Sequence, residues 1–275
     1  MIHAASRLAL VESRERLNGV LSGLGTDGTG PSTLASELYG TADLLVGQPR
    51  LRRTLADPST DATNRGNLLR SLLAGRLSGP TLEVAGAVVE QRWSSAWDLA
   101  DALEILADEA LLASAEQQGT LDTVEDELFR FERILDGAPE LTAALDEQGA
   151  PPARRIELLR SVLGSKVQPI TLELLEHAVT SARKRSIALA IDDLLEASAA
   201  RRQRSVARVI SATELTEAQT GRLTAVLSEL YGRPISVRSA IDPGIRGGLV
   251  VRVGDEVIDG TIASRLAAAK IALSH

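Results

Sequence analysis

The feature that most constrains this chain is an internal duplication with an offset of 90 residues. Residues 38–83 align without a gap on residues 128–173, and 15 of the 46 pairs are identical. The identical pairs include a glycine, a proline, an arginine and a serine: Gly47 and Gly137, Pro49 and Pro139, Arg65 and Arg155, and Ser71 and Ser161. A shared leucine content does not place these residue types in one register. We therefore infer two copies of one unit, residues 1–106 and 107–203.

Both copies show the three- and four-residue spacing of apolar side chains that is typical of an amphipathic helix. In the second copy this stripe consists of Leu121, Val124, Leu128, Phe131 and Leu135. Gly47 and Gly137 follow such stretches, and a proline comes two residues after each glycine, which predicts that a helix ends there. We predict a bundle of five or six helices in each copy.

The pattern changes after residue 204. Residues 205–210 and 234–241 are predicted strands, and residues 248–258 are a predicted hairpin around Gly254-Asp255. Between them, Thr216 and Gln219 have the spacing of a capping box, which opens a helix with the face Leu223, Val226, Leu227 and Leu230. A final helix is predicted with the face Ile262, Leu266, Ala269 and Leu273. The predicted fold class is mainly α, with two tandem helical bundles followed by a small α+β domain, residues 204–275.

The composition excludes several kinds of site. The chain has no cysteine, which excludes a thiolate metal site, a disulfide scaffold and a cysteine nucleophile. Its three histidines, His3, His177 and His275, are far apart in the sequence. A net charge of −7 argues against nucleic acid as a partner, because phosphate binding needs a basic surface. No apolar run reaches the length of a membrane span. We expect a soluble intracellular protein that meets a membrane only through a partner.

Three further features are candidate sites. Residues 23–28 match the dinucleotide pattern G-x-G-x-x-G, but an amphipathic helix precedes them and Thr29-Gly30-Pro31 follows, which favours a linker. Trp93 and Trp97 are four residues apart and are predicted to share a helix face. We interpret them as core residues; the alternative is an exposed aromatic anchor for a partner helix. His177 is interpreted as a packed side chain. We predict no catalytic, cofactor-binding or metal-binding residues, and no enzyme activity.

Residues 242–266 resemble the signature of the ATP synthase delta subunit family, which includes the mitochondrial oligomycin-sensitivity-conferring protein. The residues that carry the resemblance are Asp242, Pro243, Gly247, Gly248, Gly254, Asp255, Asp259, Gly260 and Arg265. The sequence departs from the family pattern at Gly244, Arg246 and Thr261. The resemblance covers residues 107–275, so that residues 1–106 are an additional copy of the helical domain.

The resemblance implies a non-catalytic stator subunit of the proton-translocating F-type ATP synthase, on the cytoplasmic face of the cell membrane. In this family the helical domain binds N-terminal helices of alpha subunits, and the C-terminal domain binds the end of the b-subunit stalk. The expected alpha-binding groove lies between the first and fifth helices of the second copy, at Leu111, Leu112, Ala115, Leu174, Leu175 and Ala178. The first copy is expected to add a second contact to the b-subunit stalk, or to a fused or paired stalk protein. The alternative is a free-standing helical scaffold that is not associated with the synthase.

Overall fold

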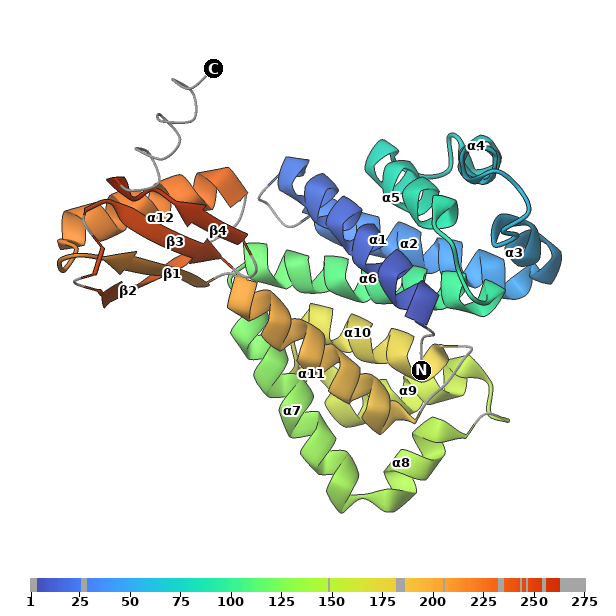
Figure 1. Cartoon of the computed structure of the whole chain (residues 1–275). Coiled ribbons are helices and arrows are strands. Elements are labelled where there is room, and N and C mark those ends of the chain that lie inside the picture. The colour runs from blue at the N-terminus through green and yellow to red at the C-terminus, as the bar shows by residue number, and fades with distance from the viewer. Residues whose placement is uncertain are drawn as a thin grey trace. The chain divides into compact units, whose positions relative to one another are not determined.

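The computed structural model describes residues 4–25, 29–147, 149–181, 186–204, 206–231, 235–242, 244–245, 247–253 and 256–262. The chain divides into two compact units, Met1–Ser198 and Ala199–His275. The first unit is helical, and the second contains a small sheet (Figure 1). The predicted fold class, mainly α with a small α+β C-terminal part, is confirmed.

The helical unit repeats its elements along the chain. Its helices are α1 (Ala4–Gly23), α2 (Thr29–Gly47), α3 (Pro49–Leu55), α4 (Ala62–Leu73), α5 (Gly79–Glu90), α6 (Ala96–Gln117), α7 (Leu121–Gly137), α8 (Pro139–Asp146), α9 (Pro152–Leu163), the 3₁₀ turn η1 (Gly164–Lys166), α10 (Pro169–Thr180) and α11 (Ile187–Arg204). The predicted helix ends at Gly47 and Gly137 are confirmed. Each is followed by a helix that begins at a proline, the residue that fits the first helical turn.

The central helix α6 belongs to both copies. Helices α4 and α5 correspond to α9 and α10 when the sequence is shifted by 90 residues. The same shift places α1 on α6, and it also places α6 on α11. The unit is therefore two overlapping six-helix bundles, α1–α6 and α6–α11, in which the last helix of the first copy is also the first helix of the second. The position 106/107, where the sequence suggested a boundary, lies inside α6.

One hydrophobic core runs through both bundles. It extends from residues of α1 such as Leu17, through Leu103 and Leu106 on α6, to Ile191 on α11, and all four are fully buried. Because the shared helix offers apolar side chains to both bundles, the two copies share one hydrophobic core. Each fully buried leucine contributes about 1.5–3 kcal/mol relative to an exposed one.

Both copies use the same polar contact to hold their fifth helix. Glu37 on α2 accepts hydrogen bonds from the backbone N–H and the hydroxyl of Ser78 and from the hydroxyl of Thr81, at the start of α5. Glu127, 90 residues later, accepts from the backbone N–H of Gln168 and from the Thr171 hydroxyl at the start of α10. A carboxylate at a helix N terminus satisfies free N–H groups and interacts favourably with the helix dipole.

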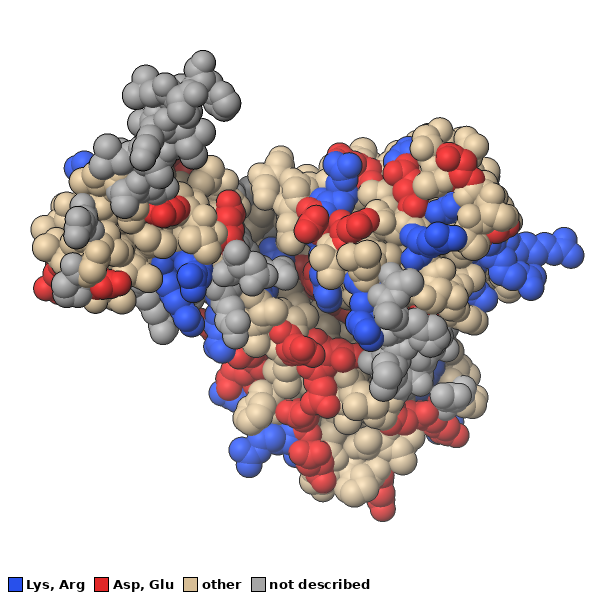
Figure 2. All heavy atoms as spheres, viewed as in Figure 1, with Lys and Arg blue, Asp and Glu red and all other residues tan. Residues whose placement is uncertain are grey.

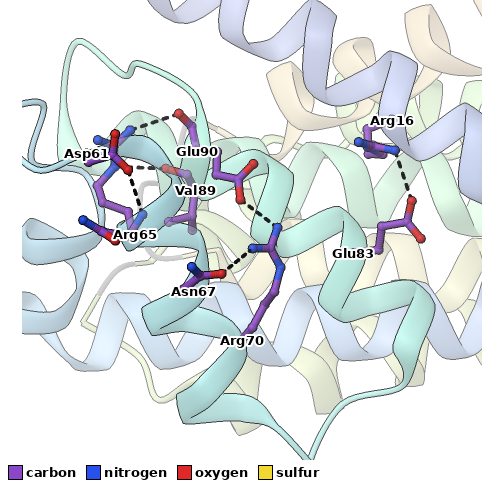
Figure 3. A network of polar contacts seen from close by, with 9 residues as sticks. Arg16, Asp61, Arg65, Asn67, Arg70, Glu83, Val89 and Glu90 are labelled. Atoms are coloured by element: carbon purple, nitrogen blue, oxygen red, sulfur yellow. Dashed lines mark hydrogen bonds and ion pairs between the residues drawn. The ribbon is translucent and has the colours of Figure 1, made fainter.

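The copies differ at a buried arginine. The Arg65 guanidinium donates five hydrogen bonds to backbone carbonyl oxygens, those of Asp57, Thr60, Val89, Glu90 and Gln91. Figure 3 shows Arg65 beside Val89 and Glu90. Three of these bonds tie α4 to the C-terminal end of α5, and the other two tie it to the segment between α3 and α4.

At the equivalent position of the second copy, Arg155 is also buried, but its Nε and Nη1 atoms have no hydrogen-bond partner in the described structure. The same sequence position is therefore a satisfied tie in the first copy and an incompletely satisfied one in the second.

The second unit contains β1 (Val206–Ser211), α12 (Glu217–Tyr231), β2 (Ser236–Ile241), β3 (Leu249–Val253) and β4 (Glu256–Asp259). The strand order is β2-β1-β3-β4 (Figure 1). Strand β1 is parallel to β2, and α12 connects them, whereas β1–β3 and β3–β4 are antiparallel. The predicted strands and hairpin are confirmed, although the turn residues Gly254 and Asp255 lie outside the described residues.

Helix α12 begins at the predicted capping box. The Gln219 backbone N–H donates to Thr216 Oγ1 at 3.3 Å, and the Thr216 N–H donates to Gln219 Oε1 at 2.9 Å. Leu227 is buried against the sheet, but Val226 and Leu230 are 54% and 64% exposed, so the predicted buried face is only partly correct. The predicted final helix lies beyond the described residues after Ile262.

Candidate partner-binding surfaces

The two helical copies meet around a small acidic cavity. Its volume is about 160 Å³, and side chains from α2, α6, α10 and α11 line it. The carboxylates that border it are Asp43, Asp101, Glu104, Asp108 and Asp193. Five carboxylates around so small a space repel one another, which favours protonation of the least solvated group.

Tyr39 connects three helices at this cavity. Its hydroxyl, on α2, donates a short hydrogen bond to Asp108 Oδ1 on α6. Its ring stacks on the His177 ring of α10, with centroids 3.4 Å apart and planes inclined by 6°. The sequence pattern predicts His177 as a packed side chain but does not single out Tyr39 or Asp108. A period of 3.6 residues shows a face of one helix, and it does not show which side chains from different copies meet.

Burial raises the pKa of Asp108 to about 8, the hydrogen bond from Tyr39 acts in the opposite direction, and the carboxylates of Glu104, Glu109 and Asp193 raise it further. Burial lowers the pKa of His177, against the effect of the nearby acidic residues Asp43 and Glu176. Both shifts favour the uncharged forms of Asp108 and His177 at this contact.

The six residues predicted to form the alpha-binding groove lie in the core of this junction. Leu111, Leu112, Ala115, Leu174 and Leu175 are fully buried. The sixth, Ala178, is partly buried and lines the cavity beside His177. Helices α6 and α10 contact each other. In this arrangement their side chains pack within the chain, and α2 covers the space between the two helices at Tyr39.

The two tryptophans do not share a helix face, which corrects the prediction from their spacing. Trp93 precedes α6, is 5% exposed, and donates from its indole N–H to the Val88 carbonyl at the end of α5. Trp97 lies in the first turn of α6, and the Arg52 guanidinium stacks on its ring at 3.5 Å. Ser95, the N-cap of α6, separates them. Because α6 begins between the two residues, their four-residue spacing does not place them on the same face of a helix.

The second unit has a cleft between α12 and the ends of β1 and β3, the two central strands of the sheet. Its volume is about 480 Å³, and it is lined by residues of α12, including Leu223 and Val226, by the segment after β1, and by Gly247 and Gly248. Val226, which lines this cleft, is more than half exposed. A cleft of this size accepts several side chains of a partner.

The signature glycines shape one wall of this cleft. Gly247 and Gly248 have φ values of 93° and 87°, a region that favours glycine. A Cβ on Gly248 would lie 2.4 Å from the Gly260 carbonyl oxygen, so the chain after β4 packs directly on this backbone. Asp242 and Asp259 each accept a hydrogen bond from a backbone N–H two residues later, that of Gly244 and that of Thr261. Their role is to fix the turns.

The remaining signature residues, Pro243, Gly254, Asp255 and Arg265, lie outside the described residues, as do residues 26–28 of the G-x-G-x-x-G stretch.

The surface of the helical unit carries uneven charge. Figure 2 shows acidic side chains gathered over α7 and α11. On these helices a hydrogen bond with Asp192 raises the pKa of Glu132, and the carboxylate of Asp192 acts in the same direction. Within the described ranges, no group of three or more histidine or acidic residues has the geometry to hold a metal ion. Among the described helices, none is both long and apolar enough to span a membrane.

Comparison with known proteins identifies the family. Residues 107–273 match the profile of the ATP synthase delta (OSCP) subunit. This range contains the second helical copy and the C-terminal unit. The chain belongs to this family. The proteins named ATP synthase subunit delta from Streptomyces griseus and Streptomyces coelicolor are 43% and 42% identical to it, each over 265 residues and 96% of this chain.

The relatives also contain the first copy. The alignments cover 97% and 96% of the two Streptomyces proteins, and the delta subunit of a Parafrankia strain is 41% identical over the full length of both chains. The duplicated architecture is therefore common to these relatives.

A chain of the Toxoplasma gondii mitochondrial ATP synthase hexamer also matches, at 17% identity and a TM-score of 0.29, over 61% of this chain and 95% of that one.

Proposed function

We propose that this chain is a non-catalytic peripheral-stalk subunit of a proton-translocating F-type ATP synthase, located at the cytoplasmic face of the cell membrane as part of that complex. It links the catalytic head to the b-subunit stalk and so resists the torque of the rotor. The observation that carries this proposal is full-length similarity, at 41–43% identity, to proteins named ATP synthase subunit delta.

The architecture supports a linking role. A helical unit and an α+β unit with separate hydrophobic cores provide two docking bodies on one chain. A stator needs two such bodies because each end must hold a different partner while force passes between them. Two linked contacts also release more slowly than either contact alone.

We propose that the helical unit binds N-terminal helices of alpha subunits. Helical bundles accept an amphipathic helix between two of their own helices, where apolar side chains of the partner replace solvent. The groove expected from the sequence, between α6 and α10, is covered by α2 at Tyr39. Leu112 and Leu174 are fully buried, so a partner helix reaches them only if the chain around them rearranges.

We propose that the C-terminal unit binds the end of the b subunit at the cleft beside α12. The exposed Val226 and Leu230 are four residues apart on α12, which is the spacing at which a helix presents one face. Substitution Val226→Asp should weaken binding of a peptide taken from the C-terminal end of the b subunit at least tenfold. Ile241→Asp is the matched control, because Ile241 is similarly exposed, at 57%, and does not line the cleft.

The proposal is tested by purifying the tagged full-length chain from gently solubilised membranes. We expect the alpha, beta and b subunits to co-purify together with ATPase activity. Recovery of the chain alone, as a folded monomer, would refute the stator function and favour a free-standing helical scaffold.

A further inference from the structure

The two copies differ at the face formed by their second and sixth helices. In the first copy, α2 and α6 pack together, and α10 of the second copy contacts α2 where the Tyr39 ring stacks on the His177 ring. Shifting the sequence by 90 residues places α7 on α2 and α11 on α6. The equivalent cover for α7 would therefore come from a third copy. After α11 the chain continues as β1 and the α+β unit instead.

Two positions that are buried at this face in the first copy are open to solvent in the second. Tyr39 on α2 is 4% exposed, whereas its counterpart on α7, Phe129, is 50% exposed. Leu99 on α6 is fully buried, whereas its counterpart on α11, Leu189, is 50% exposed. Each helix of the second pair thus presents one large apolar side chain to solvent, at a position that is covered in the first copy.

The open face is also acidic. Three positions carry fully buried apolar side chains in the first copy and carboxylates in the second: Ala42, Ala102 and Leu106 correspond to Glu132, Asp192 and Glu196. Glu125 and Asp136 are two further carboxylates on α7. Figure 2 shows acidic side chains over both helices. Because a negative surface repels phosphate groups, this face does not suit nucleic acids or anionic lipids.

These side chains form one surface, which we call the α7–α11 seam. The spacing of three or four residues along each helix places each set on one side of its helix. The two sets lie side by side, because Ser198 on α11 donates to Glu125 at 3.4 Å and a hydrogen bond joins Glu132 and Asp192. The α7 set spans about 16 Å, or about three turns of helix. The seam consists of Glu125, Phe129, Glu132 and Asp136 on α7 and Leu189, Asp192 and Glu196 on α11.

The charges of the seam indicate which kind of side chain it accepts. The hydrogen bond with Asp192 raises the pKa of Glu132, and the carboxylates of Asp192 and Asp136 act in the same direction. A basic side chain placed beside these groups would replace their mutual repulsion with attraction. The exposed Phe129 and Leu189 offer apolar contacts on both helices. The seam therefore matches a helix that carries basic and apolar side chains on one face.

We propose that the α7–α11 seam is a docking site for a basic amphipathic helix of a partner protein. This helix covers Phe129 as α10 covers Tyr39 in the first copy. Its lysine or arginine side chains pair with the carboxylates of the seam, and its apolar side chains contact Phe129 and Leu189. The inference goes beyond the proposed function, because the seam is separate from the surfaces proposed for the alpha and b subunits.

The test measures binding of a defined probe to the full-length chain by fluorescence anisotropy. The probe is a labelled synthetic peptide of about 18 residues, or about five turns, with lysines and leucines on one face of its helix. A second peptide has the same composition in an order that spreads these residues around the helix. Because both peptides carry the same charge, a difference in affinity reports docking of a helix face. We expect the amphipathic peptide to bind at least about tenfold more tightly.

Variants of the chain locate the binding at the seam. Phe129→Ser and Glu132→Lys should each lower the affinity for the amphipathic peptide at least about tenfold. Ile134→Ser is the matched control for the first variant, because Ile134 is 47% exposed on α7 and lies outside the seam. Glu140→Lys is the matched control for the second, because it changes an exposed carboxylate on α8. Both controls should bind as the wild-type chain does, and circular dichroism verifies that each variant is folded.

Three outcomes would overturn the proposal. Equal binding of the two peptides would mean that the seam is only the solvated end of the helical array. Losses of the same size in the control variants would mean that binding is not located at the seam. If analytical ultracentrifugation shows that the wild-type chain self-associates and that Phe129→Ser is a monomer, the seam binds a second copy of this chain. None of these measurements uses a synthase subunit, so their outcome is independent of the proposed function.

Discussion

Removing the ionisable group at the junction of the two copies should change how stability depends on pH. In Asp108→Asn the amide has nearly the same shape as the carboxyl, and its oxygen can still accept the hydrogen bond from Tyr39. The substitution therefore preserves the contact between α2 and α6 and abolishes the titration. Because the folded state raises the pKa of Asp108 above its ordinary value, the folded wild-type chain retains a proton that the unfolded chain releases.

The magnitude follows from this difference in proton binding. A carboxyl whose pKa rises from 3.8 to about 8 loses about 6 kcal/mol of stabilisation as the pH increases from 4 to 8. Asp108 borders a cavity and is only partly buried, so solvent screens its charge, and we expect a change on the order of 3 kcal/mol. The direction of the pH dependence follows from the raised pKa. The contribution of protonated Asp108 to the free energy of unfolding is complete below pH 4 and is lost as the pH rises to 8.

The assay is urea unfolding at pH 5, 6, 7 and 8, followed by tryptophan fluorescence. Both tryptophans of the chain, Trp93 and Trp97, lie in the first copy and report on the packing around α6. The stability of Asp108→Asn relative to wild type should increase steadily over this range. The control, Asp126→Asn, removes an exposed carboxylate paired with Arg130 and should show no such trend. Parallel pH profiles for wild type and Asp108→Asn would refute the reasoning.

Three further predictions concern the contacts that hold each unit together. Arg65→Met should cost about 3 kcal/mol in urea unfolding, because five hydrogen bonds to carbonyl oxygens are lost. Arg155→Met should cost less than about 1 kcal/mol, since two of its nitrogens lack partners, and equal costs would contradict the assignment. Gly248→Ala should unfold the C-terminal unit because its Cβ clashes with Gly260, and proton NMR spectra would show this unfolding. Gly221→Ala has open space around its Cβ and should stabilise α12 by about 1 kcal/mol. Burial would raise the pKa of Glu37, but the hydrogen bonds from Ser78 and Thr81 outweigh it and lower that pKa. In urea unfolding at pH 7, Glu37→Gln should therefore be about 2 kcal/mol less stable than wild type. This difference in stability should vanish as the pH falls below 4, where Glu37 becomes protonated.

Much of the fold follows from local sequence signals. The paired glycine–proline stops after α2 and α7, the capping box at Thr216 and the hairpin of β3 and β4 were predictable because each depends on backbone conformation and residues close in sequence. The signature around Gly248 could also be read from the sequence, since a left-handed backbone and a close approach both require glycine there. The site at Tyr39 could not be predicted, because its three partners are far apart in the chain.

The sequence by itself determined the duplication, the helical character of both copies and the family of the C-terminal half. Only the tertiary structure decided that the copies share α6, that Trp93 lies outside the helix that contains Trp97, and that most of the predicted groove residues are buried within the chain. The physical reason is that periodicity defines which face of a helix is apolar, whereas the choice of neighbour depends on the packing of all the helices together. A helix that is last in one bundle and first in the next has two packed faces, and its sequence pattern does not reveal which partner each face meets.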